Sequence, residues 1–129
     1  MIHLDTSVLI DALTGPRRSA PRLREFMAGP EQLSISSIVL FEWLRGPRSK
    51  EESDAQEAFF PNGNVVHFGS VEAEIAARLY KKVKRPRGRE ADLAVAACAL
   101  AHSAFLWTLN RQDFKDIPGL QLTRPPDMP

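Results

Sequence analysis

The first seven residues, Met-Ile-His-Leu-Asp-Thr-Ser, constrain the fold more than any other stretch of the sequence. A short apolar run stops at Asp5, two hydroxyl residues follow, and residues 8–13 have the composition of a buried helix. A strand that ends in a carboxylate and leads into a buried helix is typical of α/β enzymes, whose ligands bind at the carboxyl ends of the strands. The opening stretch therefore predicts that Asp5 lies at a ligand site, together with carboxylates from other strand ends.

Short apolar segments alternate with helical periodicities along the rest of the chain. This alternation predicts an α/β fold with a mainly parallel central sheet of four to five strands. We expect strands at residues 1–4, 33–35, 65–68, 105–109 and 119–122, and helices at residues 8–13, 21–28, 38–45, 50–60, 71–83 and 90–102. A single domain over residues 1–123 would contain all of these elements, followed by a proline-rich tail at residues 124–129.

The overall charge does not identify a partner, because 129 residues with 26% charged side chains and a net charge of +1 are ordinary for a globular protein. The basic residues are nevertheless grouped locally. One group is Arg17, Arg18, Arg22 and Arg24, and the other is Lys81, Lys82, Lys84, Arg85, Arg87 and Arg89. Such groups can follow a phosphate backbone, although solvated helices and loops also collect Lys and Arg.

Cys98 is the only cysteine, which excludes a disulfide within the chain and any zinc site built on several cysteines. It lies in an apolar helical segment, where a packing role is expected. No stretch has the length or composition of a membrane span or a secretory leader, so we expect a cytoplasmic protein with no membrane partner.

Four acidic residues are distinguished by their positions in the predicted elements. Asp5 ends the first strand, Glu42 lies on an otherwise apolar helix, Asp92 opens the buried last helix, and Asp113 follows the fourth strand. Carboxylates gathered at one sheet edge repel one another and lose hydration, which raises their pKa values or requires a cation. Since no two histidines have metal-ligand spacing, the sequence favours an oxygen-rich site for Mg²⁺ or Mn²⁺.

Each acid also has a purely structural interpretation. Asp5 can cap the first helix, and Asp92 can interact favourably with the N-terminal dipole of its own helix. Glu42 can pair with a nearby arginine, and Asp113 can begin a turn. Each structural interpretation is reasonable for one acid alone. A single shared site explains more simply why all four acids lie at or near the ends of strands.

Four segments in this order and spacing resemble the motifs of PIN-domain ribonucleases, and most closely VapC-type toxins of bacterial toxin–antitoxin pairs. They are residues 2–7, residues 36–45, residues 91–97 and residues 107–114. The resemblance implies a three-layer α/β/α fold, a Mg²⁺ or Mn²⁺ cofactor, and hydrolysis of RNA that leaves a 5′-phosphate and a 3′-hydroxyl. It also implies growth arrest until a cognate VapB-like antitoxin binds, and a homodimer.

By this resemblance, the family's acidic catalytic and metal-binding positions fall on Asp5, Glu42, Asp92 and Asp113. Thr6, Ser7 and Asn110 would be polar helpers in the pocket. Family members differ in whether the acid stands at the end of the fourth strand or three residues later. Asn110 occupies the first of these positions here, so the acidic role falls to Asp113 or to no residue.

The expected roles within the acidic set differ. Asp5 and Asp92 are the preferred direct metal ligands because both would be held on rigid elements. Glu42 would bind metal or orient the attacking water, and Asp113 would bind a second metal or act through water. The basic loop with Arg85, Arg87 and Arg89 precedes Asp92 and would hold the RNA backbone, or it is simply a solvated connection.

Two other functions compete with a nuclease. A phosphotransferase of the haloacid dehalogenase type also has Asp at the end of its first strand, but it needs a second Asp two residues later, where this chain has Ser7. A PIN-like binding module without catalysis is the second alternative, and the complete set of acids argues against it.

The aromatic and histidine residues mostly have structural interpretations. Trp107 is expected in the core, and Trp43 in the core, in a dimer contact or in an antitoxin contact. His3 and His67 are expected to pack on strands, and His102 to end the last helix.

Overall fold

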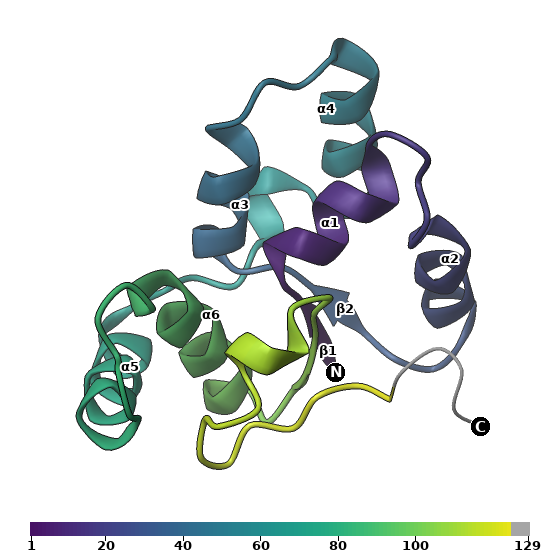
Figure 1. Cartoon of the computed structure of the whole chain (residues 1–129). Helices are drawn as coiled ribbons and strands as arrows, with labels where there is room; N and C mark the ends of the chain where they lie inside the picture. The colour runs from purple at the N-terminus through teal and green to yellow at the C-terminus, as the bar shows by residue number, and fades with distance from the viewer. Residues whose placement is uncertain (125–129) are drawn as a thin grey trace.

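A parallel sheet lies at the centre of the fold in the computed structural model, which describes residues 1–124 (Figure 1). Its three strands are β1 (Ile2–Leu4), β2 (Leu33–Ser34) and β3 (Phe105–Trp107), in the order β2-β1-β3 with both pairs parallel. The chain therefore leaves the central strand directly at Asp5. Because the strands are parallel, the residues that follow β1 and β3 lie at the same edge of the sheet.

Residues 1–124 form six α-helices around this sheet, and each corresponds to a helix predicted from the sequence. They are α1 (Thr6–Leu13), α2 (Ala20–Ala28), α3 (Ser37–Leu44), α4 (Lys50–Phe59), α5 (Ser70–Lys82) and α6 (Glu90–Ala101). In Figure 1, α5 and α6 lie on one side of the sheet and α1 and α2 on the other, with α3 and α4 beside α1. The predicted three-layer α/β/α architecture is therefore confirmed.

The sheet itself is smaller than the predicted four to five strands. Residues 65–68 pair with it through a single parallel bridge between Val66 and Ser36. Two residues later, the N–H of Phe68 donates to the hydroxyl of Ser37 at 3.0 Å, so a side chain replaces the next backbone acceptor and the ladder ends. The apolar run was correctly recognised, but its pairing is too short to form a strand.

The predicted last strand, residues 119–122, is wrong for a similar reason. Leu122 makes one parallel bridge to Leu106. Gly119 has a φ of +79°, in the left-handed region that only glycine adopts readily, so the segment begins with a turn and not with extended chain. Two short 3₁₀ turns complete the described elements, η1 (Asn62–Asn64) and η2 (Arg111–Asp113).

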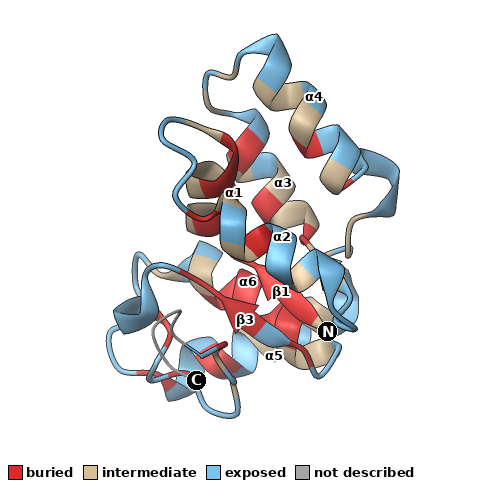
Figure 2. Cartoon of the chain, turned by 90° about the vertical axis from the view of Figure 1, so that its right-hand side faces the viewer, coloured by how far each residue is buried: buried red, intermediate tan, exposed pale blue. Residues whose placement is uncertain are grey.

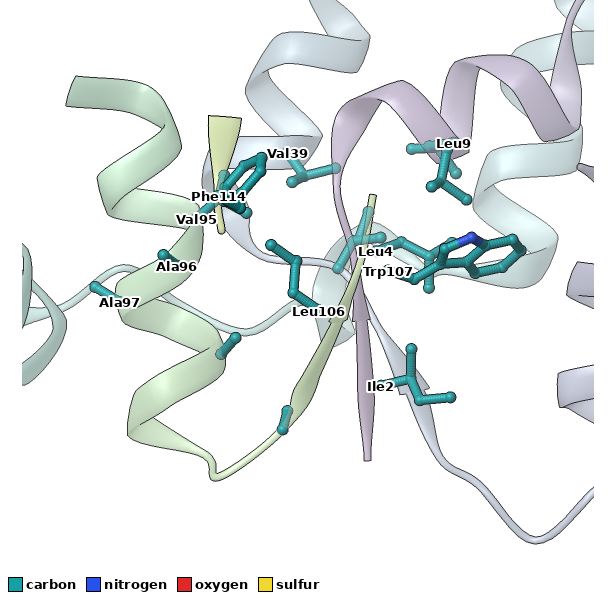
Figure 3. Close-up of a cluster of buried hydrophobic side chains, with 14 of the residues drawn as sticks. Ile2, Leu4, Leu9, Val39, Val95, Ala96, Ala97, Leu106, Trp107 and Phe114 are labelled. Carbon is teal, nitrogen blue, oxygen red and sulfur yellow. The ribbon is translucent and has the colours of Figure 1, made fainter. Parts of the chain in front are cut away.

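The core lies on both faces of the sheet. Leu106 and Trp107 are neighbours in β3 and therefore point to opposite sides, Leu106 toward α6 and Trp107 toward α1 (Figure 3). The Trp107 ring also packs edge-on against Phe26 of α2, with ring centroids 5.2 Å apart. All residues from Leu93 to Ala99 in α6 are buried, because the sheet covers one side of this helix and α5 the other (Figure 2).

Predictions for single residues had mixed outcomes. Trp107 is a core residue as expected, and Trp43 is fully buried, which excludes a direct dimer or antitoxin contact for its ring. Cys98 is buried, and burial raises the pKa of its thiol to about 11. His3 is buried on β1, where desolvation and then the nearby His102 and N-terminus lower its pKa to about 4. His67 is exposed and lies outside any strand, so its prediction was wrong.

The remaining predictions concern the chain as a whole. All described helices and strands fall between Ile2 and Asp113, inside the predicted domain of residues 1–123. The predicted tail lies, from residue 125 onward, outside the described residues. Within residues 1–124, no helix is long and apolar enough to cross a membrane.

Candidate functional site

Asp5 is fixed at the carboxyl end of β1 by contacts to the neighbouring strand end. Its backbone N–H donates to the Trp107 carbonyl at 2.9 Å, and its Oδ2 accepts hydrogen bonds from Ser7 Oγ at 2.9 Å and Thr108 Oγ1 at 2.8 Å. The residue is only 5% exposed. Although Asp5 precedes α1 at the N-cap position, its side chain makes no capping hydrogen bond. Helix capping therefore does not explain this carboxylate.

The two hydroxyls that bind Asp5 also organise the end of β3. Ser7 Oγ accepts from the Leu109 N–H at 3.1 Å, and Thr108 Oγ1 accepts from the Asn110 N–H at 3.0 Å. Asn110 thus contributes its backbone to this network. Thr108 was not among the predicted site residues, although its position directly after β3 matches that of Asp5 after β1. This shared position after a parallel strand is the sequence signal that points to Thr108 as a site residue.

Glu42 lies on α3, whose first turn is capped by Ser36 accepting from the Val39 N–H at 3.2 Å. Its Oε1 accepts a hydrogen bond from Thr6 Oγ1 at 2.6 Å, which ties α3 to the first residue of α1. Arg45 approaches the other oxygen at 3.7 Å, and the Glu42 side chain is 18% exposed. The ion pair predicted as an alternative exists, but the shorter contact is to the predicted helper Thr6.

Asp92 occupies the first turn of α6 and is electrostatically coupled to the other three acids. Partial burial is the largest cause of its raised pKa, followed by the charges of Asp5, Asp113 and Glu42. Arg89 opposes these effects, yet the pKa still rises from 3.8 to about 6. The fold therefore brings all four predicted acids into one electrostatic environment at the carboxyl edge of the sheet.

Asp113 is the least constrained of the four. It lies in η2 with an exposed side chain, and its N–H donates to the Asn110 carbonyl at 2.9 Å. The next residue, Phe114, is 1% exposed and anchors this segment in the hydrophobic core, which also contains Val95 (Figure 3). The backbone carbonyl of Asp113 accepts a hydrogen bond from Arg89 at 2.9 Å.

The three arginines of the predicted RNA-binding loop have different environments. Arg85 and Arg87 are exposed. Arg89 directs its guanidinium at protein acceptors and forms a salt bridge to Asp116 at 2.6 Å. The loop does lie beside the acidic site, but Arg89 is already engaged within the protein.

The donor chemistry of the acidic site fits a hard divalent cation, because it offers carboxylate and hydroxyl oxygens and carries excess negative charge. As the side chains are arranged, no three His, Cys, Asp or Glu residues within positions 1–124 are grouped closely enough to hold a metal ion. Coordination by three of the acids would therefore require side-chain movement. Asp113, which is exposed on a short 3₁₀ turn, has the greatest freedom to move.

Comparison with known proteins assigns this arrangement to a family. The family model described as PIN domain matches residues 2–120, which includes all four acids. The chain belongs to the PIN-domain family. This PIN domain is 34% identical over 124 residues to Ribonuclease VapC19 of Mycobacterium tuberculosis, an alignment that covers 92% of this chain and 95% of that protein.

Solved structures agree with this assignment. A toxin–antitoxin complex from Klebsiella pneumoniae matches the PIN domain with a TM-score of 0.70 and 30% identity, covering 93% of this chain and 95% of the other. DNA-bound VapBC from Salmonella typhimurium matches with a TM-score of 0.74 at 22% identity, covering 95% and 96%, and supports the fold alone. Membership in the PIN family also excludes the haloacid dehalogenase alternative, consistent with a serine at position 7.

Proposed function

We propose that this PIN domain is a Mg²⁺- or Mn²⁺-dependent endoribonuclease toxin, inhibited by a cognate VapB-like antitoxin. The observation that carries the proposal is the placement of Asp5, Glu42, Asp92 and Asp113 together at the carboxyl edge of the sheet, where burial and then the charges of the other three raise the pKa of Asp92. The charges of three acids oppose ionisation of the partly buried Asp92, which is a costly arrangement in a fold of this size unless a cation or a phosphate-bound metal compensates it. The relative named Ribonuclease VapC19, which aligns over nearly its whole length, supports RNA as the substrate.

The roles of the four acids would differ according to how firmly the fold holds each side chain. Asp5, fixed by two hydroxyl donors, and Asp92, on the rigid α6, would be the principal metal ligands. Glu42 would complete the ligand set or accept a proton from the attacking water, and Asp113 would join them from η2. A bound Mg²⁺ or Mn²⁺ would supply activation of water and neutralisation of charge on the scissile phosphate.

The hydroxyl residues would act through the acids. Ser7 and Thr108 both hold Oδ2 of Asp5, and among residues 1–124 no hydrogen bond reaches Oδ1, which would face a cation. Thr6 holds Oε1 of Glu42 in the same way. Such hydrogen bonds fix the orientation of ligands, and their loss commonly lowers metal affinity or activity by about 10- to 100-fold.

The proposal includes protein partners. The solved toxin–antitoxin complex from Klebsiella pneumoniae, at 30% identity, supports an antitoxin, and we propose that this chain meets it in the cytoplasm as a homodimer. Large apolar side chains are exposed on α3 and at the start of α5, where Phe41 is 60%, Leu44 53% and Val71 59% exposed. These side chains offer apolar surface for a second copy or for the antitoxin.

Metal dependence is the direct test. After chelation of divalent ions, purified protein should not cleave RNA, and added Mg²⁺ or Mn²⁺ should restore cleavage to products with 5′-phosphate and 3′-hydroxyl ends. Purified cognate antitoxin should then abolish the activity. Cleavage that persists in chelator, or RNA binding without cleavage at any metal concentration, would contradict the proposal, and the second result would favour a binding module without catalysis.

The exposed arginines of the basic loop predict a salt effect on RNA binding. Replacing Arg85 and Arg87 together with glutamine should weaken binding and lower the slope of log affinity against log salt by about 1.4, since each phosphate contact to single-stranded RNA contributes about 0.7. The matched control replaces Lys81 and Lys82, which are exposed near the end of α5 and carry the same charge. A slope equal to that of the wild type in the Arg85 and Arg87 variant would show that the loop is only a solvated connection.

A further inference from the structure

Arg89 makes an unusually complete set of hydrogen bonds for a residue on a surface loop. Its Nη1 and Nη2 donate to the two oxygens of Asp116 at 3.0 and 2.6 Å, forming a bidentate pair. Nη2 also donates to the Asp113 carbonyl at 2.9 Å, and Nη1 to the Lys84 carbonyl at 3.3 Å. The Arg89 side chain is 20% exposed, so the protein covers most of its surface.

These contacts join the two segments that carry separate acids of the site. Arg89 is the N-cap residue of α6, three positions before Asp92. Asp116 lies three positions after Asp113, on the segment that follows η2. The bidentate pair therefore fastens the start of α6 to the loop after β3, directly beside Asp92 and Asp113. The charges of both acids act on the Arg89 guanidinium, which indicates that the pair borders the site.

Asp113 needs an external contact more than the other acids do. Asp5 and Glu42 are each held by hydroxyl donors, and Asp92 is held on a buried helix, whereas Asp113 is exposed on a three-residue turn. The bond from Arg89 reaches the backbone of Asp113 itself. Its strength depends on a guanidinium whose position Asp116 fixes through two short charged hydrogen bonds.

We propose that Arg89 and Asp116 form a positioning pair that holds Asp113 in register with Asp92, so that both can serve the same metal centre. This inference rests on the proposed metal-dependent function. It assigns Arg89 a role inside the protein, in place of the RNA-backbone contact predicted from the sequence. Neither residue touches substrate in this role, because both act through the placement of Asp113.

Two single substitutions separate positioning from simple electrostatics. Asp116→Asn leaves a positive charge beside the acids, and Arg89→Gln removes one. If the pair acts only through charge, the first should weaken Mn²⁺ binding and the second should strengthen it. If it positions Asp113, both should weaken Mn²⁺ binding to the RNA-free protein by about 10-fold, as is typical when the partner of a metal ligand is lost. Electron paramagnetic resonance of free Mn²⁺ measures this affinity directly.

The chain offers a matched control. Asp54 forms a salt bridge to Lys50 at 2.9 Å on the exposed surface of α4, a helix that carries none of the four acids. Asp54→Asn should therefore leave Mn²⁺ affinity unchanged. The reciprocal double variant, Arg89→Asp with Asp116→Arg, should recover affinity relative to either single charge reversal. Thermal unfolding identifies any variant that has lost its fold. If a single variant is unfolded, the Mn²⁺ affinity of the double variant is compared with that of the wild type instead.

The outcomes distinguish this inference from the proposed function. Weaker Mn²⁺ binding in both single variants, with an unchanged KM for RNA and a lower kcat, supports the positioning pair. Tighter Mn²⁺ binding by Arg89→Gln overturns it, as does a raised KM with unchanged Mn²⁺ affinity, which would return Arg89 to the RNA surface. A wild-type protein that binds Mn²⁺ but cleaves no RNA would refute the nuclease proposal while leaving the effect of the pair on the metal measurable.

Discussion

Replacing Asp5 with asparagine is expected to lower RNA cleavage by at least about 100-fold while the protein remains folded. Loss of a residue that merely orients a metal ligand costs about 10- to 100-fold, and Asp5 is proposed to be a ligand itself. The neutral amide cannot compensate the charge of a divalent cation. Cleavage of a labelled RNA at saturating Mg²⁺ measures the effect.

The fold should survive because asparagine has the same shape and can keep the surrounding hydrogen bonds. The amide oxygen can still accept from Ser7 and Thr108, which now bind Oδ2 of Asp5 at 2.9 and 2.8 Å. The matched control is Asp11→Asn on α1, the helix that follows Asp5, where the carboxylate accepts from Ser19 Oγ at 2.6 Å. Full activity of the Asp5 variant, or equal losses in the two variants, would refute the metal-ligand role of Asp5.

The helices and the central acids were predictable because they depend on local patterns. Apolar spacing marked all six helices, Gly-Pro pairs at residues 15–16, 29–30 and 46–47 ended the first three, and a carboxylate directly after an apolar strand marked Asp5. Parallel strands then required that residues following β1 and β3 meet at one edge. The proximity of Asp5, Glu42, Asp92 and Asp113 follows from this topology and the family motifs.

The features that were missed depend on contacts between distant segments. An apolar run such as residues 65–68 shows that a segment will be partly buried, but not that Ser37 will replace a backbone acceptor after one bridge. The same limit applies to the Arg89–Asp116 pair, whose members are 27 positions apart in sequence. From the sequence, a basic loop next to an acidic site suggested contact with a phosphate backbone. Only the folded structure shows that Arg89 of this loop binds the carboxylate of Asp116 instead.

The stability of the metal-free protein should depend on pH through Asp92. Its pKa is 3.8 in ordinary surroundings and about 6 in the fold, so the folded state binds more protons than the unfolded chain between these values. The free energy of unfolding must therefore fall as pH rises from about 4 to about 6, and it stays at the lower value above that range. Asp92 is an unusual carboxylate in this respect, since its protonated form is the one that the fold favours.

Asp92→Asn should remove this penalty. At pH 8 in chelator, we expect the variant to be more stable than the wild type by about 1 kcal/mol, a value reduced for the partial solvent exposure of Asp92. For a domain of this size, this corresponds to a rise in Tm of about 4 °C. At pH 4 the two proteins should unfold at the same temperature. A variant that is less stable than the wild type at pH 8 would show that burial and the neighbouring acids do not disfavour the charged form of Asp92.

Added metal should reverse the order of stability at pH 8. A ligand at 100 times its Kd stabilises the folded state that binds it by about 2.7 kcal/mol, which exceeds the penalty relieved by the substitution. Mg²⁺ or Mn²⁺ should therefore raise the Tm of the wild type above that of Asp92→Asn, and should leave the variant nearly unchanged. The same substitution should abolish RNA cleavage. If metal stabilises both proteins equally, Asp92 is not a ligand, and its raised pKa reflects burial and crowding alone.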